Sequence, residues 1–547
     1  MEILENKDEI ELFTKLNLWG QASLDLLFRQ KIQTNRSNIG LSGYSICEDD
    51  FVELNYIQIQ AIVNKISEQF LLSGLKAGDV FALQLPNSIE SQIIYLACWQ
   101  QGISIAPLPI LWRESDVEQA LIRISPQAYI CPILHDGFSF TDHMYKVGFN
   151  ITSIKLLFSL GGNAIDGCSG LDEFFKFEAT HDVNLLKPED YPFVDPNSTC
   201  LISFSKDLSG NNTPLYHTHN HLVAASKIYN SLSKPTRNSK IISPFPPTCM
   251  AICAINITSW IISDASLVCY DGLMATEFQN IPLDNSILCL PATFCENKLV
   301  DALFKQNLAK LTFVQKINSN ILSDQYVRED VIDVTTFDEI AFLPTLRVDN
   351  TSQIEAGNYE YKLIDNAVID TIMLVKHQNK QDKNVWKVSC SFLPSNVIKI
   401  GNAYTSDILC SNNTGINAEL NIGNMSVNYT DIERCLLGFH GVDDAAILVI
   451  EERLLGSKPV FAIVPKVGAI ILHHELIEFI KNKGISTYKL PQELYKIPEI
   501  PRDYDNNIIR RTTKEKLLKQ IGPLVSGVSK DGLLAVQEEL ASLLANS

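Results

Sequence analysis

The residues best suited to chemistry lie in one loop between a predicted strand and a predicted helix. The segment LISFSKDLSGNNTPLYHTHNHLVAA, residues 201–225, begins with an apolar run, passes through small polar residues and ends in helix-forming ones. Small residues at such a junction can present backbone N–H groups to a phosphate. Taken alone the pattern is weak, because a working phosphate loop usually offers several glycines and a lysine. Here Gly210 stands by itself in the loop.

Three histidines alternate directly after this loop, at His217, His219 and His221. Alternating histidines can ligate a metal ion. They also occur where a strand passes into a helix, and Thr218 is a residue type that caps helices. We therefore expect these histidines to serve the helix start and its packing rather than a metal.

Helical and strand-like patterns alternate through the first part of the chain. Residues 56–72 carry apolar side chains at helical spacing, and further helices are predicted in SIESQIIYLACWQQGI and RESDVEQALIRI. Strands are predicted between and after them, in GLKAGDVFALQLPNS, SIAPLP and QAYICPI. This alternation indicates βαβ units and a mostly parallel sheet, and it recurs from about 198 to 345.

The pattern changes twice later in the chain. From about 348 to 405 the chain is strand-like, with short runs of alternating apolar and polar residues divided by polar turns. We expect residues 377–387 to form an exposed hairpin tip. A smaller unit follows, with helices predicted in NYTDIERCLLGF and HHELIEFIKNKG and paired strands in DDAAILVIEE and PVFAIVP. We expect an α/β fold with a large N-terminal domain of βαβ-built sheets (1–410, with a β-rich subdomain at about 348–410), a smaller α+β C-terminal lid domain (411–522) and a helical tail (523–547).

Composition restricts the classes of protein to consider. The 547 residues include 45 Lys and Arg against 63 Asp and Glu, so the formal net charge is 45 − 63 = −18. That balance argues against nucleic-acid binding, which relies on clustered basic residues. The N-terminus shows no secretory signal, and polar residues interrupt the apolar stretch 250–267, so we expect a cytoplasmic protein without a membrane span. The 13 cysteines contain no CxxC pair and are expected to be reduced, buried thiols.

Six segments, in order, resemble motifs of the adenylate-forming superfamily, which comprises acyl-CoA synthetases, peptide-synthetase adenylation domains and luciferases. They are the early region GLKAGDVFALQLPNSIESQIIYLACWQQGISIAPLPILWRESDVEQALIRISPQAYI, the loop ending in Thr218-His219, FDEIAFLPTLR, Ala403-Tyr404-Thr405-Ser406-Asp407, VNYTDIERCLLGFHGVDDAAILVI, and YKLPQELYKIPEIPRDYDNNIIRR. The resemblance covers about 60–520. It implies the fold of this superfamily and its reaction, in which a carboxylate and ATP give acyl-AMP and pyrophosphate. The acyl group is then usually transferred to a thiol of CoA or a carrier protein.

The chain departs from the family in the phosphate loop, which typically runs Thr-Ser-Gly-Thr-Thr-Gly-x-Pro-Lys-Gly. Counting back from His219, it has Lys206 at the serine, Asp207 at the first glycine, Thr213 at the lysine and Pro214 at the last glycine. An aspartate repels phosphate, and a proline removes a backbone donor. The missing lysine removes a charge-assisted hydrogen bond worth roughly 1.5–3 kcal/mol.

Further departures lie nearer the C-terminus. The closing motif Pro-Arg-Thr-x-Ser-Gly-Lys aligns with 501–507, which places neutral Asn507 at the adenylation lysine. The hinge segment Thr414-Gly415-Ile416-Asn417 has no charged pivot, and the family's glycine-rich turn becomes Gly423-Asn424-Met425-Ser426. The last change weakens the expectation that CoA or a carrier-protein thiol is a co-substrate. The acyl-pocket segment SPFPPTCMA (243–251) shows no clear histidine or aromatic counterpart.

Other features of a nucleotide site persist. The resemblance implies that Asp407 binds the ribose hydroxyls and that Glu339 helps to hold Mg, although Asp407 can equally cap a turn and Glu339 can be a surface acid. ATP or AMP and Mg are the implied ligands, and a small carboxylic acid or acyl group the implied partner. Arg510 and Arg511 are expected on a solvated surface. The nucleotide-binding candidates are Ser205, Lys206, Ser209, Gly210, Asp338, Glu339 and Asp407.

Three functional hypotheses follow. The first is a degenerate acyl-CoA synthetase-like protein with weak or no adenylation, which keeps acyl, aryl or nucleotide binding or serves a biosynthetic complex. The second is an active ATP-dependent carboxylate–CoA or carrier-protein ligase in which Lys206 or Lys489 supplies the missing charge. The third is an ATP-independent acyl-transfer or hydrolytic enzyme on the same fold, for which no nucleophile elbow is visible.

Overall fold

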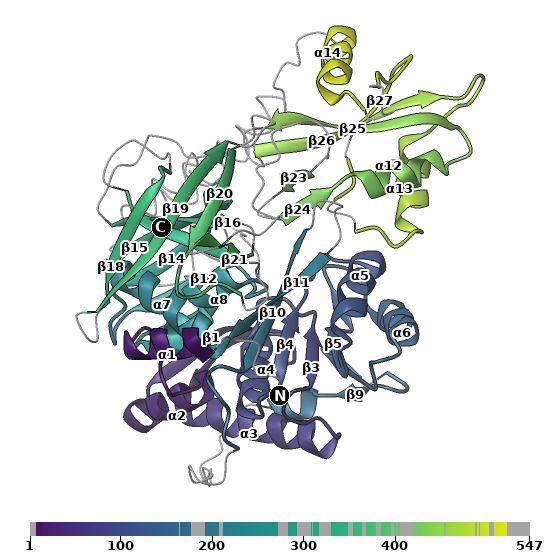
Figure 1. Cartoon of the computed structure of the whole chain (residues 1–547). Coiled ribbons are helices and arrows are strands. Elements are labelled where there is room, and N and C mark those ends of the chain that lie inside the picture. The colour runs from purple at the N-terminus through teal and green to yellow at the C-terminus, as the bar shows by residue number, and fades with distance from the viewer. Residues whose placement is uncertain are drawn as a thin grey trace, which may run out of the picture. The chain divides into compact units, whose positions relative to one another are not determined.

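A computed structural model gives the fold (Figure 1). The structure describes residues 7–521 with gaps. The segments that lie outside the description are 177–191, 207–211, 272–282, 293–307, 317–329, 348–353, 364–367, 379–383, 395–398, 401–402, 405–418, 423–424, 453–455, 487–488 and 503–507. The single residues 164, 309, 338 and 492 also lie outside it. The chain divides into two compact units. The larger comprises 1–292, 307–318 and 324–411, and the smaller comprises the remainder.

The first sheet of the larger unit has seven strands in the order β11-β10-β4-β3-β5-β8-β9. Its neighbours are parallel except for the β10–β11 hairpin. The strands are β3 (Val80–Leu83), β4 (Ser104–Pro107), β5 (Ala128–Pro132), β8 (Leu156–Leu160), β9 (Ser169–Gly170), β10 (Thr199–Lys206) and β11 (Asn212–Thr218). The parallel sheet predicted from the alternating pattern is therefore confirmed.

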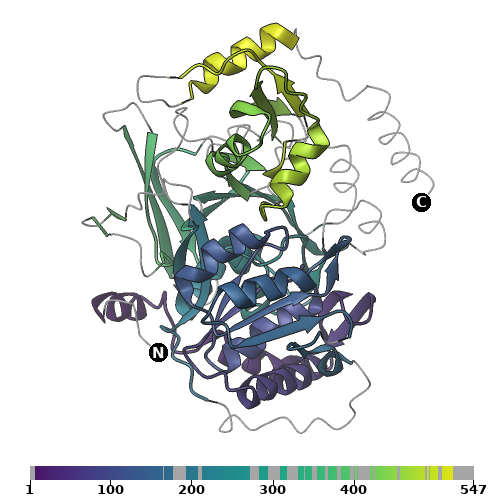
Figure 2. The ribbon, with the colours of Figure 1, turned by 90° about the vertical axis from the view of Figure 1, so that its right-hand side faces the viewer.

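Helices cover both faces of this sheet. α4 (Ile89–Gln100) contacts β4 on one side and β1 of the next sheet on the other, and every residue of α4 is buried. An apolar helix without a polar face fits only between two layers. On the outer face, α5 (Glu114–Ile124) packs against α6 (Thr141–Asn150) and against β11 (Figure 2).

The second sheet has eight strands in the order β17-β16-β15-β14-β12-β13-β1-β2, parallel except at its two edges. Three more helices pack in this part of the unit: α2 (Leu24–Asn35) and α3 (Tyr56–Leu72) against α4, and α7 (His219–Ser233) against β17. Helix α3 has the bounds predicted from its periodicity. The strands are β1 (Ile39–Ser45), β2 (Asp50–Asn55), β12 (Lys240–Ser243), β13 (Ser266–Cys269), β14 (Ser286–Pro291), β15 (Lys310–Lys316), β16 (Val331–Phe337) and β17 (Ala341–Leu346).

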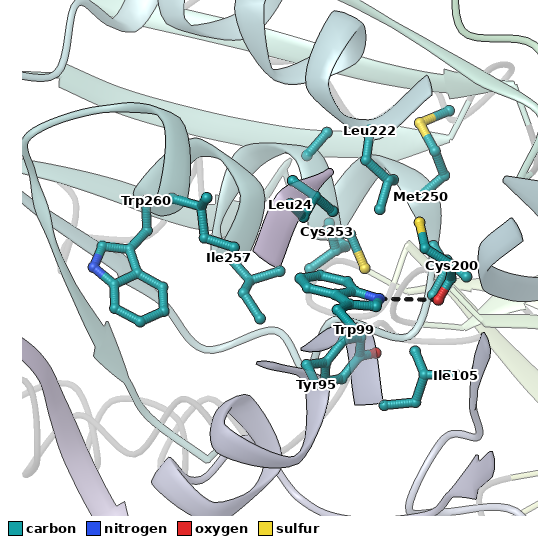
Figure 3. Close-up of a cluster of buried hydrophobic side chains, with 14 of the residues drawn as sticks. Leu24, Tyr95, Trp99, Ile105, Cys200, Leu222, Met250, Cys253, Ile257 and Trp260 are labelled. Carbon is teal, nitrogen blue, oxygen red and sulfur yellow. Dashed lines mark hydrogen bonds between the residues drawn. The ribbon is translucent and has the colours of Figure 1, made fainter. Parts of the chain in front are cut away.

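The main hydrophobic core lies between these layers (Figure 3). Trp99 of α4 packs there, and its indole nitrogen donates a hydrogen bond of 3.0 Å to the carbonyl of Cys200. The apolar stretch 250–267 forms α8 (Met250–Ile255), α9 (Ile257–Ile262) and the start of β13, as buried elements. The expectation that this stretch is internal is thus confirmed. Within the described part of the chain, no helix is long and apolar enough to cross a bilayer, and every cysteine is free.

The last part of the larger unit is an antiparallel sheet ordered β18-β19-β20-β22-β21. Its strands are β18 (Gly357–Lys362), β19 (Ile369–Gln378), β20 (Asn384–Ser389), β21 (Lys399–Ile400) and β22 (Ala403–Tyr404). β19 and β20 pair from Met373–Ser389 to Gln378–Asn384, so the hairpin predicted around 377–387 is present, with its tip outside the described residues. The strand-rich region after about 348 is confirmed.

The smaller unit combines an antiparallel strand pair with helices. β25 (Val442–Glu452) pairs with β26 (Gly456–Pro465), and β27 (Glu493–Lys496) lies parallel to β26. One face of this sheet packs against α12 (Thr430–Leu437) and α13 (His473–Lys481), and the other against α14 (Arg510–Ile521). A hairpin of β23 (Glu419–Ile422) and β24 (Met425–Asn428) precedes them. The predicted helices and paired strands are confirmed; the tail 523–547 lies outside the described residues.

Candidate functional site

The phosphate-loop candidate is the β10–β11 hairpin. In its register Ser205 faces Thr213 and Lys206 faces Asn212. Ser205 is buried at 4% exposure, and Thr213 is half-buried. The hairpin geometry explains how residues from the two arms of the loop come together. The candidates Ser209 and Gly210, together with Asp207, lie outside the described residues.

Helix α5 supports the second arm of this hairpin through polar contacts. Asn212 donates from Nδ2 to the carbonyl of Asp116 at 3.2 Å. Arg123, in the last turn of α5, donates from Nη1 to the hydroxyl Oγ1 of Thr213, also at 3.2 Å. Arg123 therefore contacts the residue that we predict at the family's lysine position. Sequence reasoning missed Arg123, and no local signal marks it, because the contact depends on packing between a helix and a strand 90 residues apart.

The three histidines lie at the end of β11 and in the first turn of α7 (His219–Ser233), and His221 takes part in the helix cap. Thr218 caps the helix: its Oγ1 accepts from the backbone N–H of His221 at 3.2 Å, and its own N–H donates to Nδ1 of His221 at 3.1 Å. Such a reciprocal pair satisfies two donors that the helix start leaves unpaired. His219 Nδ1 accepts from the N–H of Leu24 at 3.3 Å, and His217 Nε2 lies 2.9 Å from Ser203 Oγ.

Burial keeps two of these rings uncharged. Desolvation lowers the pKa of His217 and of His219 to about 3. Neutral rings in the apolar core suit a packing role. Among the described residues, no group of three or more His, Cys, Asp and Glu is placed to hold a metal ion. The predicted helix-start or packing role is confirmed: His221 takes part in the helix cap, and His217 and His219 pack in the core.

The magnesium candidate Glu339 lies in the turn between β16 and β17, at the carboxyl end of the parallel sheet. Its carboxylate lies beside Cys249, the residue before α8. Burial raises the pKa of the Cys249 thiol, and the charge of Glu339 and a side-chain hydrogen bond to it raise the pKa further. No pattern in the sequence predicts that Cys249 and Glu339 lie close together. Asp338 lies outside the described residues.

The segment 243–251 connects β12 to α8 at the same sheet edge. Its backbone carbonyls are bound from several elements: the hydroxyl of Tyr95 donates to Pro247, and Asn256 Nδ2 donates to Phe245 at 3.3 Å. Asn87 Nδ2 donates to the carbonyls of Ser243 at 2.7 Å and Tyr270 at 2.8 Å, which joins the two sheets. These bonds fix the backbone of the segment, which ends with Cys249 beside Glu339.

A cavity of about 1510 Å³ opens elsewhere in the larger unit, near the carboxyl ends of β5, β8 and β13. Its walls include Tyr44, Phe51 and several carboxylates, and His135 lies 3.3 Å from Asp271 within it. Of the predicted site residues whose side chains the structure describes, neither Ser205 nor Glu339 lines this cavity. The hairpin and Glu339 are therefore separate from it.

The closing motif is anchored inside the smaller unit. Arg502 donates to both carboxylate oxygens of Asp444, at 3.2 and 2.6 Å, and its backbone bridges to Ile508. This holds together the two ends of the segment that contains Asn507, which itself lies outside the described residues. Lys489, a candidate substitute cation, is buried at 8% exposure in the same unit.

The expectation of a solvated Arg510 is wrong. Its Nη1 and Nη2 donate to Oε1 and Oε2 of Glu433 at 2.6 and 2.8 Å, and Nη1 also donates to the carbonyl of Ile447 at 2.8 Å. The side chains of Arg510 and Glu433 are only 17% and 8% exposed. Asp407 and the hinge segment 414–417 lie outside the described residues, as does the first half of the turn 423–426.

Comparison with known proteins identifies the family of this chain. Residues 41–315 match the family described as AMP-binding enzyme. Over 555 residues the chain is 19% identical to the medium-chain fatty-acid–CoA ligase of Escherichia coli, and 94% of each protein is covered. A shorter stretch, 17% of this chain and 18% of the relative, is 28% identical to the vibriobactin-specific 2,3-dihydroxybenzoate-AMP ligase of Vibrio cholerae.

Solved structures show the same fold. The amide bond synthetase McbA of Marinactinospora thermotolerans superposes with a TM-score of 0.67 at 11% identity, covering 89% of this chain and 99% of that one. A variant of the o-succinylbenzoate CoA synthetase of Bacillus subtilis, bound to a product analogue, superposes with a TM-score of 0.64 at 13% identity, covering 91% and 99%. The predicted α/β class, with a large N-terminal and a smaller C-terminal domain, is confirmed.

Proposed function

The chain belongs to the AMP-binding enzyme family, and we propose that within it the protein is an acyl-CoA synthetase-like member whose ATP-dependent adenylation is weak or lost. It keeps a nucleotide site and binds a small carboxylic acid or acyl group. The domain organisation that goes with this proposal is an AMP-binding-type domain of 1–410, a lid of 411–522 and a helical tail of 523–547.

One observation carries the proposal. The alignment puts Thr213 at the family's phosphate-loop lysine, and the short neutral side chain of Thr213 accepts a hydrogen bond from Arg123. The alignment places a second neutral residue, Asn507, at the adenylation lysine. Adenylation requires the charge that develops on the phosphates to be neutralised. Loss of both lysines removes two of the charges that usually meet this need.

Other residues support continued binding of ligands. Ser205 remains at the hairpin, and Glu339 remains at the sheet edge, where a carboxylate suits Mg bound to phosphate oxygens. Family members use ATP and Mg, and we propose that this chain binds ATP or AMP with Mg. CoA or a carrier-protein thiol is not part of the proposal, because the glycine-rich turn after the hinge is replaced by 423–426.

The test is carboxylate-dependent exchange of pyrophosphate into ATP, measured on the full chain with a panel of short-, medium-chain and aromatic acids. Exchange is expected to be far below that of an active family member assayed beside it. Thermal shift with ATP, AMP and Mg then reports binding, since a ligand at 100 times its dissociation constant adds roughly 2.7 kcal/mol of stability. Exchange at the rate of the active member contradicts the proposal of weak adenylation.

A second candidate is an active ATP-dependent ligase in which other cations replace the lysines. The contact between Arg123 and Thr213 favours it, because it brings a guanidinium to the altered hairpin. Lys206 ends β10 on the opposite arm. Lys489 is a poorer candidate, since it is buried in the smaller unit. Substantial exchange by the wild-type chain, abolished by Lys206→Ala or Arg123→Ala, would establish this candidate.

A further inference from the structure

We propose that the cavity of about 1510 Å³ in the larger unit binds an organic cation, namely a primary ammonium group carried on an aromatic body. Neither Ser205 nor Glu339 lines this cavity, and the inference does not depend on the proposed nucleotide site. The floor of the cavity is one face of strands β13, β1 and β2, which are neighbours in the eight-stranded sheet. Its other walls come from the segments that follow β3, β5 and β8 of the seven-stranded sheet.

The floor consists of alternate residues along each strand, which point to the same face of a sheet. The residues that line the cavity here are Ser266, Val268 and Tyr270 of β13, Ser42, Tyr44 and Ile46 along β1 and its end, and Asp49, Phe51 and Glu53 along β2 and its start. In the register of β1 and β2, Ser42 pairs with Glu53. Tyr44 pairs with Phe51. A polar row and an aromatic row therefore lie next to each other on the floor.

The polar row offers two oxygen acceptors that are not used within the protein. Ser42 is only 6% exposed and lines the cavity, and its hydroxyl forms no hydrogen bond with any residue that the structure describes. The carboxylate of Glu53 likewise has no hydrogen bond or ion pair within the described ranges. Side chains directly opposite each other on antiparallel strands have Cβ atoms about 4.5–5.5 Å apart. An ammonium group placed between these two side chains can donate to both oxygens.

The aromatic row gives the body of the ligand a surface to pack on. Tyr44 is 38% exposed and Phe51 is 45% exposed, although both line a cavity. The ring centroid of Phe51 lies 5.9 Å from that of Tyr270. Residues two apart on a strand are separated by about 7 Å, so an aromatic ring joined to an amine by a short alkyl chain can reach both rows. The aromatic faces also attract a nearby cation.

The charge of the cavity walls favours a cation over an anion. Six carboxylates and one lysine line the cavity, so the formal charge of the lining is 1 − 6 = −5 with His135 counted as neutral. Asp172 Oδ1 accepts from the backbone N–H groups of Gly161 and Gly162 at 2.9 and 3.0 Å, and His135 lies 3.3 Å from Asp271. These contacts fix the positions of the negative charges in the walls. A concave surface lined by one sign of charge concentrates ligands of the opposite sign. The six carboxylates are those of Asp49, Glu53, Asp136, Asp172, Glu173 and Asp271, and the lysine is Lys240.

The experiment is calorimetric titration of the full chain, without nucleotide, with phenethylamine and separately with phenylacetate. The two probes have the same ring and a side chain of similar length, but their charges are opposite. We expect the wild-type chain to bind phenethylamine and to bind phenylacetate far more weakly. The affinity for phenethylamine should fall as ionic strength rises, because the cavity is open to solvent. Equal affinity for the two probes overturns the inference, and so does the absence of phenethylamine binding at millimolar concentrations.

Single variants assign the binding to the two rows. Glu53→Gln removes the charge of the polar row while keeping its shape, and it should weaken phenethylamine about threefold or more. Ser42→Ala removes the second acceptor and should weaken it about twofold to tenfold. Phe51→Ala removes the aromatic surface and should weaken it about threefold or more.

Glu68→Gln is the matched control, because Glu68 is an exposed acid of α3 that does not line the cavity. This variant should bind phenethylamine as the wild-type chain does. The midpoint of thermal unfolding, measured for each variant, establishes that it is folded. If the folded Glu53→Gln variant binds phenethylamine as tightly as the wild-type chain, the inference is wrong. An equal loss in Glu68→Gln and Glu53→Gln also overturns it, because the effect would then come from the overall charge of the chain.

Discussion

Arg510 and Glu433 form a two-bond ion pair inside the smaller unit, with nitrogen–oxygen distances of 2.6 and 2.8 Å. Glu433 Oε1 also accepts from the backbone N–H of Ile447 at 2.7 Å. The pair therefore ties the start of α14, directly after the closing motif, to α12 and β25. Arg510, which follows the closing motif, therefore has a structural role.

Breaking this pair should destabilise the smaller unit. Glu433→Gln leaves the guanidinium of Arg510 largely buried without a counter-charge, and this should lower the free energy of unfolding by about 3 kcal/mol. Urea denaturation followed by fluorescence measures the change. Lys516→Ala, which breaks the exposed pair of Lys516 with Glu499, is the control and should cost at most about 1 kcal/mol. Equal effects of the two variants would contradict the structural role of the Arg510–Glu433 pair.

The cap of α7 offers a test of local stability next to the hairpin. Thr218→Ala removes the hydroxyl that accepts from the N–H of His221, so it should cost about 1 kcal/mol of stability. Thr218→Ser keeps the hydroxyl and should retain most of that stability. Thermal and urea unfolding measure both variants. A serine variant as unstable as the alanine variant would show that the methyl group, and not the cap, matters.

Stability should fall with acid because of His217 and His219. Their folded pKa is lowered to about 3 from 6.5, so between these values the unfolded chain binds protons that the folded chain does not. Stability is then complete above about pH 6.5 and decreases as the pH falls toward 3, by about 1.4 kcal/mol per pH unit for each histidine.

The measurement is the free energy of unfolding in urea between pH 7 and pH 5. His219→Gln should reduce the slope of stability against pH by about one proton. The same substitution at exposed His474 is the control, because that side chain meets water in both states. An unchanged slope in the His219→Gln variant would show that the wild-type His219 ring binds its proton equally in the folded and unfolded states.

Restoring the family's lysines should raise adenylation. The double variant Thr213→Lys, Asn507→Lys returns charge at both positions, and each restored charge-assisted hydrogen bond to phosphate should increase pyrophosphate exchange by about tenfold or more. Thr213→Gln, Asn507→Gln supplies length without charge and should leave exchange at the wild-type level. If the glutamine variant gains as much as the lysine variant, charge is not what the wild-type chain lacks.

Glu339 should determine the magnesium dependence of nucleotide binding. Glu339→Gln removes the charge while keeping the shape, and it should reduce the additional thermal shift that Mg gives in the presence of ATP. EDTA should reduce the shift of the wild-type chain to that of the variant. A Mg-dependent shift of the same size in Glu339→Gln would assign the metal to other residues. Glu355, an exposed acid outside the site, provides the matched control through Glu355→Gln.

Much of the fold was predictable because its signals are local. The apolar spacing of 56–72 identifies α3, and Thr218 with the histidines that follow identifies the start of α7. These features depend on residues within a few positions of one another, where helical periodicity and capping act directly. The helix predicted to run to Gly484 ends at Lys481 instead, with Asn482 as its cap. Such an end depends on competing local bonds that periodicity does not report.

The candidate site also has features that can be read from the sequence and features that depend on packing. The residue types at the hairpin and the closing motif can be read directly along the chain, including Thr213 and Asn507 at the positions where we predict the family's lysines. The contact of Arg123 with Thr213, the position of Cys249 beside Glu339 and the pairing of Arg510 with Glu433 come from the packing of the folded chain. These partners are separated by 77 or more residues along the chain. Their meeting depends on strand order and helix packing, and the free energy of such contacts comes from burial and geometry that a linear pattern does not contain.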